Sequence, residues 1–446
     1  MTSVLWFRRD LRLGDHAALL AAAEAEGPVL ALYVLDEKLL KPSGAPRRAF
    51  LFDSLRALDE QLDGRLLVVH GDPVQEVLRV ARSAEATAVH VSADTGPYGR
   101  WRDEKVAKSL ARHDIDFVAT GSPYAVQPGR VTKPDGDPYR VFTPFRRAWA
   151  EHGWRRPADT GVSLVDWVKP GKSAKIPKSP ALGDTQLPEA GEAAALEGWH
   201  DFLETGLSRY ATDRDRPDRP GTTRMSTYLH WGAIHPRTML SDLAGKSGDG
   251  VQALRSELCW REFHADVLWH RPETARKNYD RRFDKMKHDE DVEVFEAWCA
   301  GRTGYPIVDA GMRQLLAEGW MHNRIRMVVA SFLVKDLHLP WWWGARHFMR
   351  HLVDGDLASN QLNWQWVAGS GTDAAPYFRI FNPTTQGEKF DPDGEYVRRY
   401  VPELREVAGK AVHKLKERPE KYAAPLVDHA EERQVALERF GAIKQS

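Results

Sequence analysis

The stretch that decides the fold of this chain is Asp354-Gly-Asp-Leu-Ala-Ser-Asn360-Gln-Leu-Asn363-Trp364-Gln-Trp366. If the chain is helical from Leu357 onward, Asn360 and Trp364 lie four residues apart on one helix face. Asp354 and Asp356 then flank the start of that helix, where carboxylates can cap backbone amides or hold an arginine. A buried amide beside an indole needs a polar partner, which a heteroaromatic ligand with ring nitrogens would provide. A capped helix that packs two tryptophans into a core is the alternative.

The composition is that of an ordinary globular protein with an excess of tryptophan. The chain has 446 residues, enough for two or three domains, with 42% hydrophobic and 28% charged residues. Its formal net charge of zero argues against an overall polycation but is compatible with a local basic surface. Of the 16 tryptophans, 11 follow residue 190, so we expect the aromatic chemistry in the second half.

The cysteines and the N-terminus indicate the compartment. Cys259 and Cys299 are the only cysteines, which implies no disulfide framework and suits a reducing cytosol. The sequence has no apolar run of signal-peptide length at its start and no stretch of about twenty apolar residues. We therefore expect a cytoplasmic protein with no membrane span.

The first part of the chain alternates short apolar runs with helical patterns. The runs predict buried strands at Val4–Phe7, Val29–Leu35, Leu66–Val69, Ala88–Val91 and Phe117–Ala119. The patterns between them predict helices at Ala17–Glu26, Arg47–Leu62, Val74–Arg82 and Arg102–His113. This alternation indicates a doubly wound parallel sheet, which binds ligands at the carboxyl ends of its strands. No glycine-rich dinucleotide fingerprint follows the first strand, which argues against a nicotinamide enzyme.

Prolines recur from Gly121 to about Ala195 and apolar periodicity fades, which predicts a long interdomain connection wrapped on the surface. After it, the segment from Tyr210 to Ser226 is too polar and too rich in proline to be core. Its Gly221-Thr-Thr run precedes a helical pattern that starts near Tyr228, an arrangement that can hold a phosphate. A plain capped loop is the alternative at this point.

Taken together, the stretch at 354–366, its continuation Thr372–Gln386 and the opening Phe7–Leu19 resemble the DNA photolyase/cryptochrome family. The resemblance covers nearly the whole chain. It implies an α/β N-terminal doubly wound parallel sheet domain plus a C-terminal all-α FAD-binding domain. The expected boundaries are 1–125 for the antenna domain, 126–195 for the linker and 196–446 for the helical FAD- and DNA-binding catalytic domain.

The resemblance assigns site residues one by one. The residues assigned to FAD are Tyr210, Thr222, Thr223, Arg224, Met225, Ser226, Arg261, Arg326, Asp354, Asp356 and Asn360. Those assigned to substrate DNA are Arg214, Glu257, Trp260, Asn323, Arg324, Met327 and Trp366. The catalytic set is Glu257, Asn360, Trp364 and Trp341. No metal site is expected, since no ligand cluster stands out among the 17 histidines.

Four of these residues distinguish subfamilies. Glu257 and Trp260 lie three apart on a predicted helix, and Asn323 and Met327 lie four apart on another. Photolyases that act on cyclobutane pyrimidine dimers carry these four residue types, whereas (6-4) enzymes show a His-His pair where this chain has His322 and Asn323. The resemblance therefore points to a class I dimer photolyase. A blue-light receptor that binds FAD and signals through a partner is the alternative, and a generic flavin oxidoreductase is a third.

The expected reaction follows from the resemblance. Excited FADH⁻ gives one electron to a flipped-out dimer in double-stranded DNA, the cyclobutane ring opens, and the electron returns. Trp260 and Trp366 would stack on bases, and a protonated Glu257 would stabilise the radical anion. Arg214 and Arg324 would neutralise phosphates. We expect a monomer. We also expect a protein like those of bacteria, located in the cytoplasm and associated with the nucleoid.

Two further expectations concern light. Folate-antenna members carry an Asn-Glu pair where this chain has Tyr98 and Gly99, so a second chromophore of the 8-hydroxy-5-deazaflavin or flavin type is expected rather than folate; an empty antenna pocket is the alternative. Trp364 and Trp341 match the first two tryptophans of the family's electron route, but His288 stands at the third. The candidates for another exit are Trp342, Trp343 and Tyr377.

Overall fold

The computed structural model describes residues 2–25, 27–171, 173–373 and 378–444. Tyr377, one of the expected electron exits, lies outside these residues. The chain divides into two compact units, and each is described by itself. Unit 1 comprises residues 1–182, 188–207 and 223–272, and unit 2 comprises residues 183–187, 208–222 and 273–446.

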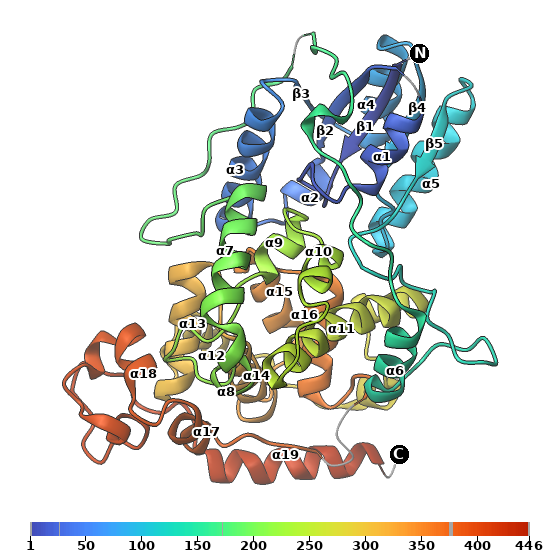
Figure 1. The fold of residues 1–446 in the computed structure, drawn as a ribbon. Helices are drawn as coiled ribbons and strands as arrows, with labels where there is room; N and C mark the ends of the chain where they lie inside the picture. Colours follow the sequence, from blue (N-terminus) through green and yellow to red (C-terminus); the bar gives the residue numbers. More distant parts are fainter. Residues whose placement is uncertain (1, 26, 172, 374–377, 445–446) are drawn as a thin grey trace. The chain divides into compact units, whose positions relative to one another are not determined.

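Unit 1 contains a five-stranded parallel sheet with the strand order β3-β2-β1-β4-β5. The strands are β1 (Thr2–Phe7), β2 (Val29–Leu35), β3 (Leu66–His70), β4 (Ala86–Val91) and β5 (Asp116–Ala119). β1 and β2 are almost wholly buried because helices cover both faces of the sheet, as Figure 1 shows. The expected doubly wound sheet is confirmed.

Helices join these strands and extend unit 1. The helices of the sheet region are α1 (Ala17–Glu24), α2 (Glu37–Leu40), α3 (Ala45–Gln61), α4 (Pro73–Ser83) and α5 (Pro97–Ala111). Those that follow are α6 (Phe142–His152), η1 (Val162–Leu164), α7 (Glu192–Thr205), α9 (Ser226–Trp231), α10 (Pro236–Asp242) and α11 (Asp249–His270). The second group gives unit 1 a helical part in which α6 packs against α11.

All regular elements in the described part of unit 2 are helices or 3-10 turns. Its longer helices are α12 (Val292–Cys299), α13 (Pro306–Glu318), α14 (Asn323–Lys335), α15 (Trp341–His351), α16 (Leu357–Ala368), α17 (Pro383–Phe390) and α19 (His429–Lys444). Its short elements are α8 (Tyr210–Asp213), α18 (Glu395–Tyr400) and the 3-10 turns η4 (Arg281–Lys285), η5 (Pro402–Leu404) and η6 (Gly409–His413). The turns η2 (Leu207–Arg209) and η3 (Pro272–Ala275) lie at the unit boundaries. One buried cluster, with Trp298, Phe332 and Trp364 among its members, forms the core.

Close packing of α15 on α16 fixes the element that carries the central motif. α16 begins where expected, at Leu357, and ends at Gly369, whose φ of 89° lies in the left-handed region that glycine tolerates. On α15, a Cβ added at Gly344 would lie 2.2 Å from the ring of Trp364. Only glycine therefore lets this indole lie directly against the α15 backbone.

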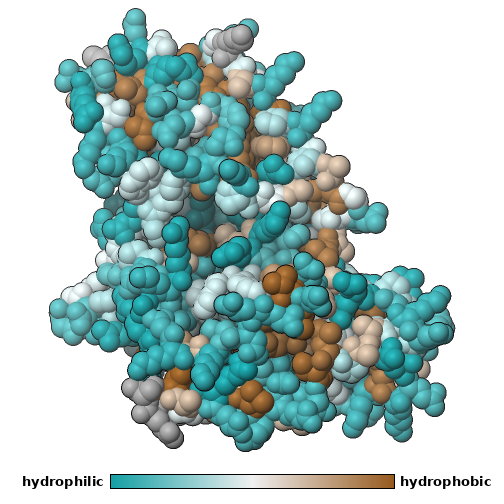
Figure 2. Space-filling view, turned by 180° about the vertical axis from the view of Figure 1, so that it is seen from behind, coloured by the Kyte–Doolittle hydropathy of each residue, from teal (hydrophilic) through white to brown (hydrophobic). Residues whose placement is uncertain are grey.

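The outer surface is polar. Large exposed hydrophobic side chains are scattered along the chain, and hydrophilic residues predominate on the face drawn in Figure 2. In the part of the chain that the structure describes, no helix combines the length and apolar character needed to cross a membrane.

Candidate active site

The carboxylates at the start of α16 behave as the sequence predicts. The Asp356 side chain accepts a hydrogen bond from the Ser359 backbone N–H at 2.9 Å and caps the helix. Asp354 accepts a hydrogen bond from Nη2 of Arg326 at 2.8 Å, in an ion pair whose carboxylate is almost fully buried. Nε of Arg326 donates to the Met321 carbonyl at 2.8 Å, so this guanidinium is held at two points.

The face of α16 that carries Asn360 and Trp364 is fixed by α15. The Asn360 side-chain amide donates to the Ala345 carbonyl at 3.1 Å and to Oε1 of Gln361 at 2.9 Å. Trp364 is 3% exposed and packs edge-on against Phe348, with ring centroids 5.0 Å apart. Contacts within the protein therefore hold the amide and the indole in defined positions.

One atom of this cluster fits a bound flavin. Oδ1 of Asp354 is buried and has no hydrogen-bond partner among the described residues, although Oδ2 is paired with Arg326. A buried acceptor without a donor is costly, and a ligand hydroxyl or N–H would satisfy it. Arg326, Asp354, Asp356 and Asn360 are thus suited to hold a polar ligand at the start of α16.

The expected phosphate loop is divided between the two units. In unit 2, Tyr210 is buried and the Arg214 guanidinium lies 5.6 Å from its ring centroid, while Thr222 is half-buried. In unit 1, Oγ1 of Thr223 accepts a hydrogen bond from the Met225 backbone N–H at 3.2 Å.

Within this loop, Arg224 adopts a φ of 52°. Residues other than glycine, asparagine and aspartate seldom adopt this backbone conformation, and those that do are often found in ligand-binding loops. The Ser226 side chain is exposed at the start of α9, while Met225 before it is buried. The loop is thus a turn with one left-handed residue that leads into α9. Its assignment to a phosphate stays a prediction.

The DNA-binding residues expected in unit 2 lie at the start of α14. Asn323 is exposed, and Met327 follows one turn later. Arg324 is already paired, since Nη2 and Nε donate to Asp215 Oδ1 at 2.7 and 3.3 Å. Its guanidinium also lies 4.4 Å from the ring centroid of Phe390. A phosphate would have to compete with Asp215 for this arginine.

The residues expected in unit 1 lie on α11. Glu257 and Trp260 are both half-buried on this helix. Arg261 donates to the carbonyls of Pro123 at 2.8 Å and Leu229 at 3.1 Å, so the residue expected to bind FAD also ties together two segments of its own unit. One face of Trp260 is covered by Phe142, with ring centroids 3.6 Å apart and planes 7° apart.

Trp366 borders a cavity that the sequence did not predict. Its indole N–H donates to the Asp373 carbonyl at 3.0 Å. The cavity is also lined by Lys335 and Phe381. Burial lowers the pKa of Lys335 to about 7, an effect that the neighbouring Asp336 carboxylate opposes. No sequence motif marks this lysine, because its burial depends on packing between distant segments.

The aromatic side chains beside Trp341 define the surroundings of the expected electron route. The Trp341 indole N–H donates to Oδ1 of Asn278 at 2.9 Å, a partner that the sequence did not reveal. The ring of Trp342 lies 6.0 Å from that of Trp341 and 5.2 Å from that of His288. Trp343 instead meets Phe295 at 5.2 Å.

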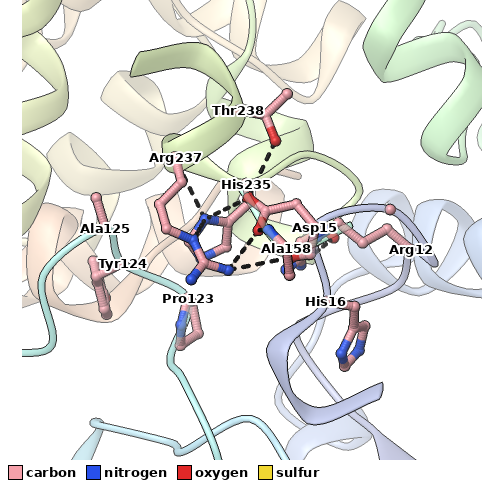
Figure 3. Close-up of polar contacts among 12 residues, drawn as sticks. Arg12, Asp15, His16, Pro123, Tyr124, Ala125, Ala158, His235, Arg237 and Thr238 are labelled. Atoms are coloured by element: carbon pink, nitrogen blue, oxygen red, sulfur yellow. Dashed lines mark hydrogen bonds and ion pairs between the residues drawn. The ribbon is translucent and has the colours of Figure 1, made fainter. Parts of the chain in front are cut away.

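Unit 1 also contains a buried polar network that no motif predicted (Figure 3). Asp15 accepts hydrogen bonds from Arg237 at 2.6 Å, from Thr238 at 3.2 Å and from the Ala158 backbone N–H at 2.8 Å. Burial acts to raise the pKa of Asp15, but the hydrogen bond from His235 and the charges of His235, Arg237 and Arg12 outweigh it and lower the pKa to about 2. The network joins the loop after β1 to α10 and gives this part of unit 1 a fixed shape.

Comparison with known proteins identifies the chain in two steps. A family model described as the FAD binding domain of DNA photolyase matches residues 254–442, so the chain is a flavoprotein whose cofactor is FAD. A second model, described as DNA photolyase, matches residues 3–162.

The relatives extend over the whole length. The deoxyribodipyrimidine photo-lyase of Agrobacterium fabrum is 40% identical, over 99% of this chain and 98% of that protein. A crystal structure of a class III photolyase from Agrobacterium tumefaciens has a TM-score of 0.92 and 38% identity, and the match covers 100% of this chain and 98% of that one. The crystal structure of an archaeal photolyase from Sulfolobus tokodaii has a TM-score of 0.89 and 31% identity, over 99% of this chain and 100% of that one. It is described as containing two FAD molecules, with the implication of a novel light-harvesting cofactor.

The chain therefore belongs to the DNA photolyase family. The family, the two-part fold and the expectation of an enzyme of the lyase type are confirmed. The relatives do not separate class I, which the sequence indicated, from class III, since the Agrobacterium structure is described as class III.

Proposed function

We propose that this chain uses light and FAD to repair cyclobutane pyrimidine dimers in double-stranded DNA. The observation that carries the proposal is a residue set: Glu257, Trp260, Asn323 and Met327 all stand on helices at the expected spacing, in a chain with full-length photo-lyase relatives. FAD, when bound, fully reduced and excited by light, would supply the electron that opens the cyclobutane ring and would take that electron back afterwards.

The residues of the chain act by binding and orienting the lesion. Flipping a dimer out of the duplex costs a few kcal/mol, and less when the lesion already pairs badly. The Trp260 indole offers a stacking surface that is worth about 1–3 kcal/mol per base. Glu257 lies one turn earlier on α11. In its protonated form, its carboxyl O–H can donate a hydrogen bond to a pyrimidine carbonyl and stabilise negative charge as it develops there.

In unit 2, the exposed Asn323 amide carries both a donor and an acceptor, which matches a pyrimidine imide edge. Met327, one turn later, offers a soft apolar contact. Asn360, whose amide N–H groups are held by Ala345 and Gln361, would present its oxygen from a fixed position.

The test is irradiation of the protein, with its FAD fully reduced, in the presence of a dimer-containing oligonucleotide. Blue light should restore the two thymines, and dark incubation should not. Protein that binds FAD but restores no thymines under light would contradict the proposal and favour a photoreceptor.

Asn323→Ala gives a sharper test. Loss of its hydrogen bonds should weaken binding of dimer DNA roughly tenfold, with little effect on undamaged DNA. Asn363→Ala is the matched control, because Asn363 is also an exposed asparagine on a helix of unit 2 but is not assigned to the lesion. Equal losses on both DNAs in a binding titration would refute the assignment of Asn323.

A further inference from the structure

The parallel stack of Phe142 on Trp260 is the closest aromatic contact in the described part of unit 1. The ring centroids are 3.6 Å apart and the planes differ by 7°. Phe142 is the first residue of α6 and Trp260 lies in the middle of α11, two helices that pack against each other. Phe142 is 7% exposed, so its ring is committed to the interior of the unit.

The other ring contacts of Trp260 are not parallel to the indole. Phe263 meets it at 5.7 Å with planes 72° apart, and His264 at 5.4 Å with planes 37° apart. Among the described residues, therefore, Phe142 alone lies parallel to the indole and covers a full face. Trp260 itself stays half-buried, which leaves indole surface for a further contact.

The stack matters because an indole that is already immobilised loses little entropy when a base binds. Fixing a flexible side chain in a complex costs free energy, and a well-packed aromatic pair contributes a free energy of similar size beyond the area that it buries. Phe142 thus removes a cost that Trp260 would otherwise meet on binding, and it dictates which indole face receives the base.

We infer that Phe142 is a positioning residue for lesion recognition: it holds Trp260 so that one defined indole face stacks on the flipped pyrimidine. This inference rests on the proposed function, in which Trp260 meets the lesion. Phe142 makes no contact with DNA and acts through Trp260.

The experiment measures the affinities of the full-length protein, with its FAD bound, for a dimer-containing and for an undamaged oligonucleotide. Phe142→Leu keeps the apolar volume but removes the aromatic face. It should lower the ratio of the two affinities about threefold to tenfold, through weaker binding of dimer DNA alone. Phe142→Tyr retains the ring and should keep the wild-type ratio.

Phe145→Leu is the matched control. Phe145 lies one turn further along α6 in the same aromatic cluster, and its ring contacts Phe263 at 5.1 Å and Tyr139 at 6.1 Å rather than Trp260. This change should lower the unfolding midpoint while leaving the affinity ratio unchanged. A purely structural role of Phe142 would give the Phe145→Leu pattern and would overturn the inference.

A double-mutant cycle with Trp260→Ala separates the inference from the proposed function. In the Trp260→Ala background, Phe142→Leu should cause no further loss; an equal loss in both backgrounds would overturn the inference. If Trp260→Ala alone keeps the wild-type ratio, the assignment of Trp260 to the lesion fails. If Trp260→Ala abolishes the preference for dimer DNA but Phe142→Leu keeps the wild-type ratio of affinities, only the role of Phe142 is refuted.

Discussion

At the scale of single residues, the ion pair between Arg324 and Asp215 governs how Arg324 can bind a phosphate. The two side chains are 23% and 44% exposed, and such pairs contribute only about 0–1 kcal/mol. A DNA phosphate can therefore displace Asp215. Arg324→Ala should lower the slope of log affinity against log salt by about 1, and Asp215→Asn should strengthen binding to damaged and undamaged DNA alike.

The matched control for this prediction is Arg282→Ala. Arg282 also pairs with an aspartate of its own unit, Asp280, but is not assigned to DNA. It should leave the salt slope unchanged. An unaltered slope in Arg324→Ala, measured by titration from low to moderate salt, would show that this guanidinium stays with Asp215 in the complex.

Single residues also show how far sequence reasoning reaches. The Asp356 cap could be predicted because it depends on a residue three positions away, and helix capping is a local rule. The sequence indicated that Asp354 could hold an arginine, but not that Arg326 was the one. The Phe142–Trp260 stack and the Asp215–Arg324 pair could not be predicted, because their partners meet only after segments that are distant in the sequence pack together.

At the scale of elements, α11 anchors the segment that was expected to be a surface linker. Glu262 accepts hydrogen bonds from the backbone N–H groups of Ala125 at 2.5 Å and Val126 at 3.1 Å, and from the Trp149 indole at 2.6 Å. One turn later, Asp266 accepts from the Gly129 backbone N–H at 2.7 Å. The strands and helices were predictable from local periodicity, whereas these carboxylates were not, because their bonding partners lie more than a hundred residues away.

Glu262 should make the stability of unit 1 depend on pH. Burial raises its pKa to about 7, although the hydrogen bonds from Trp149, Val126 and Ala125 act in the opposite direction. Because the pKa of Glu262 is higher in the folded than in the unfolded state, the protonated side chain contributes to the free energy of unfolding. This stabilisation is fully present below about pH 4.5 and is lost as the pH rises through 7. The loss amounts to about 3 kcal/mol in the free energy of unfolding.

The predicted pH dependence can be checked by urea unfolding of the wild type and of Glu262→Gln at several pH values between 5 and 8. The variant should be less stable at pH 5, because its amide NH₂ faces N–H donors, and its stability should vary less with pH. Glu151→Gln, at an exposed position of α6, is the matched control and should retain the wild-type profile. Parallel profiles for Glu262→Gln and the wild type would contradict the titration of Glu262.

The helices α15 and α16 carry the expected electron route, and its exit can be tested. Trp364→Phe should abolish photoreduction of oxidised FAD and leave repair by chemically reduced enzyme largely intact, since in the proposed reaction the electron for the dimer comes directly from the reduced flavin. Of the expected exits, Trp342 has its ring beside Trp341, so Trp342→Phe should shorten the lifetime of the tryptophan radical. Trp343→Phe, whose ring meets Phe295, is the control.

Transient absorption on these variants is the measurement. An imidazole is much harder to oxidise than an indole, so His288 should not carry the hole although it touches Trp342. His288→Trp should therefore lengthen the lifetime of the charge-separated state, in which the flavin is reduced and a tryptophan is oxidised. If this substitution changes neither the yield nor the lifetime of the charge-separated state, the residue at position 288 does not limit electron transfer along the expected route.

At the scale of the whole molecule, a second chromophore would add light harvesting to the repair chemistry of the flavin. In unit 1, the residue that bears on the identity of the second chromophore is Gly99. Family members with a folate antenna carry glutamate at this position. A Cβ added there would lie 2.0 Å from the carboxylate carbon of Asp94, and Nη2 of the buried Arg102 donates to that carboxylate at 3.1 Å. A side chain at 99 would thus push Asp94 away from Arg102, so a glutamate there requires a local rearrangement. The deazaflavin or flavin type stays a prediction.

Protein made in a host that synthesises 8-hydroxy-5-deazaflavin should accordingly absorb beyond the FAD bands, and its action spectrum for repair should follow the added band. Protein from a host without deazaflavin is the control for that band. If the action spectrum of both preparations follows FAD alone, the antenna pocket holds no deazaflavin, and a content of one FAD per chain would then show that it holds no flavin either. Gly99→Glu should abolish the added band and destabilise unit 1, because Asp94 must leave Arg102 to make room for the new side chain.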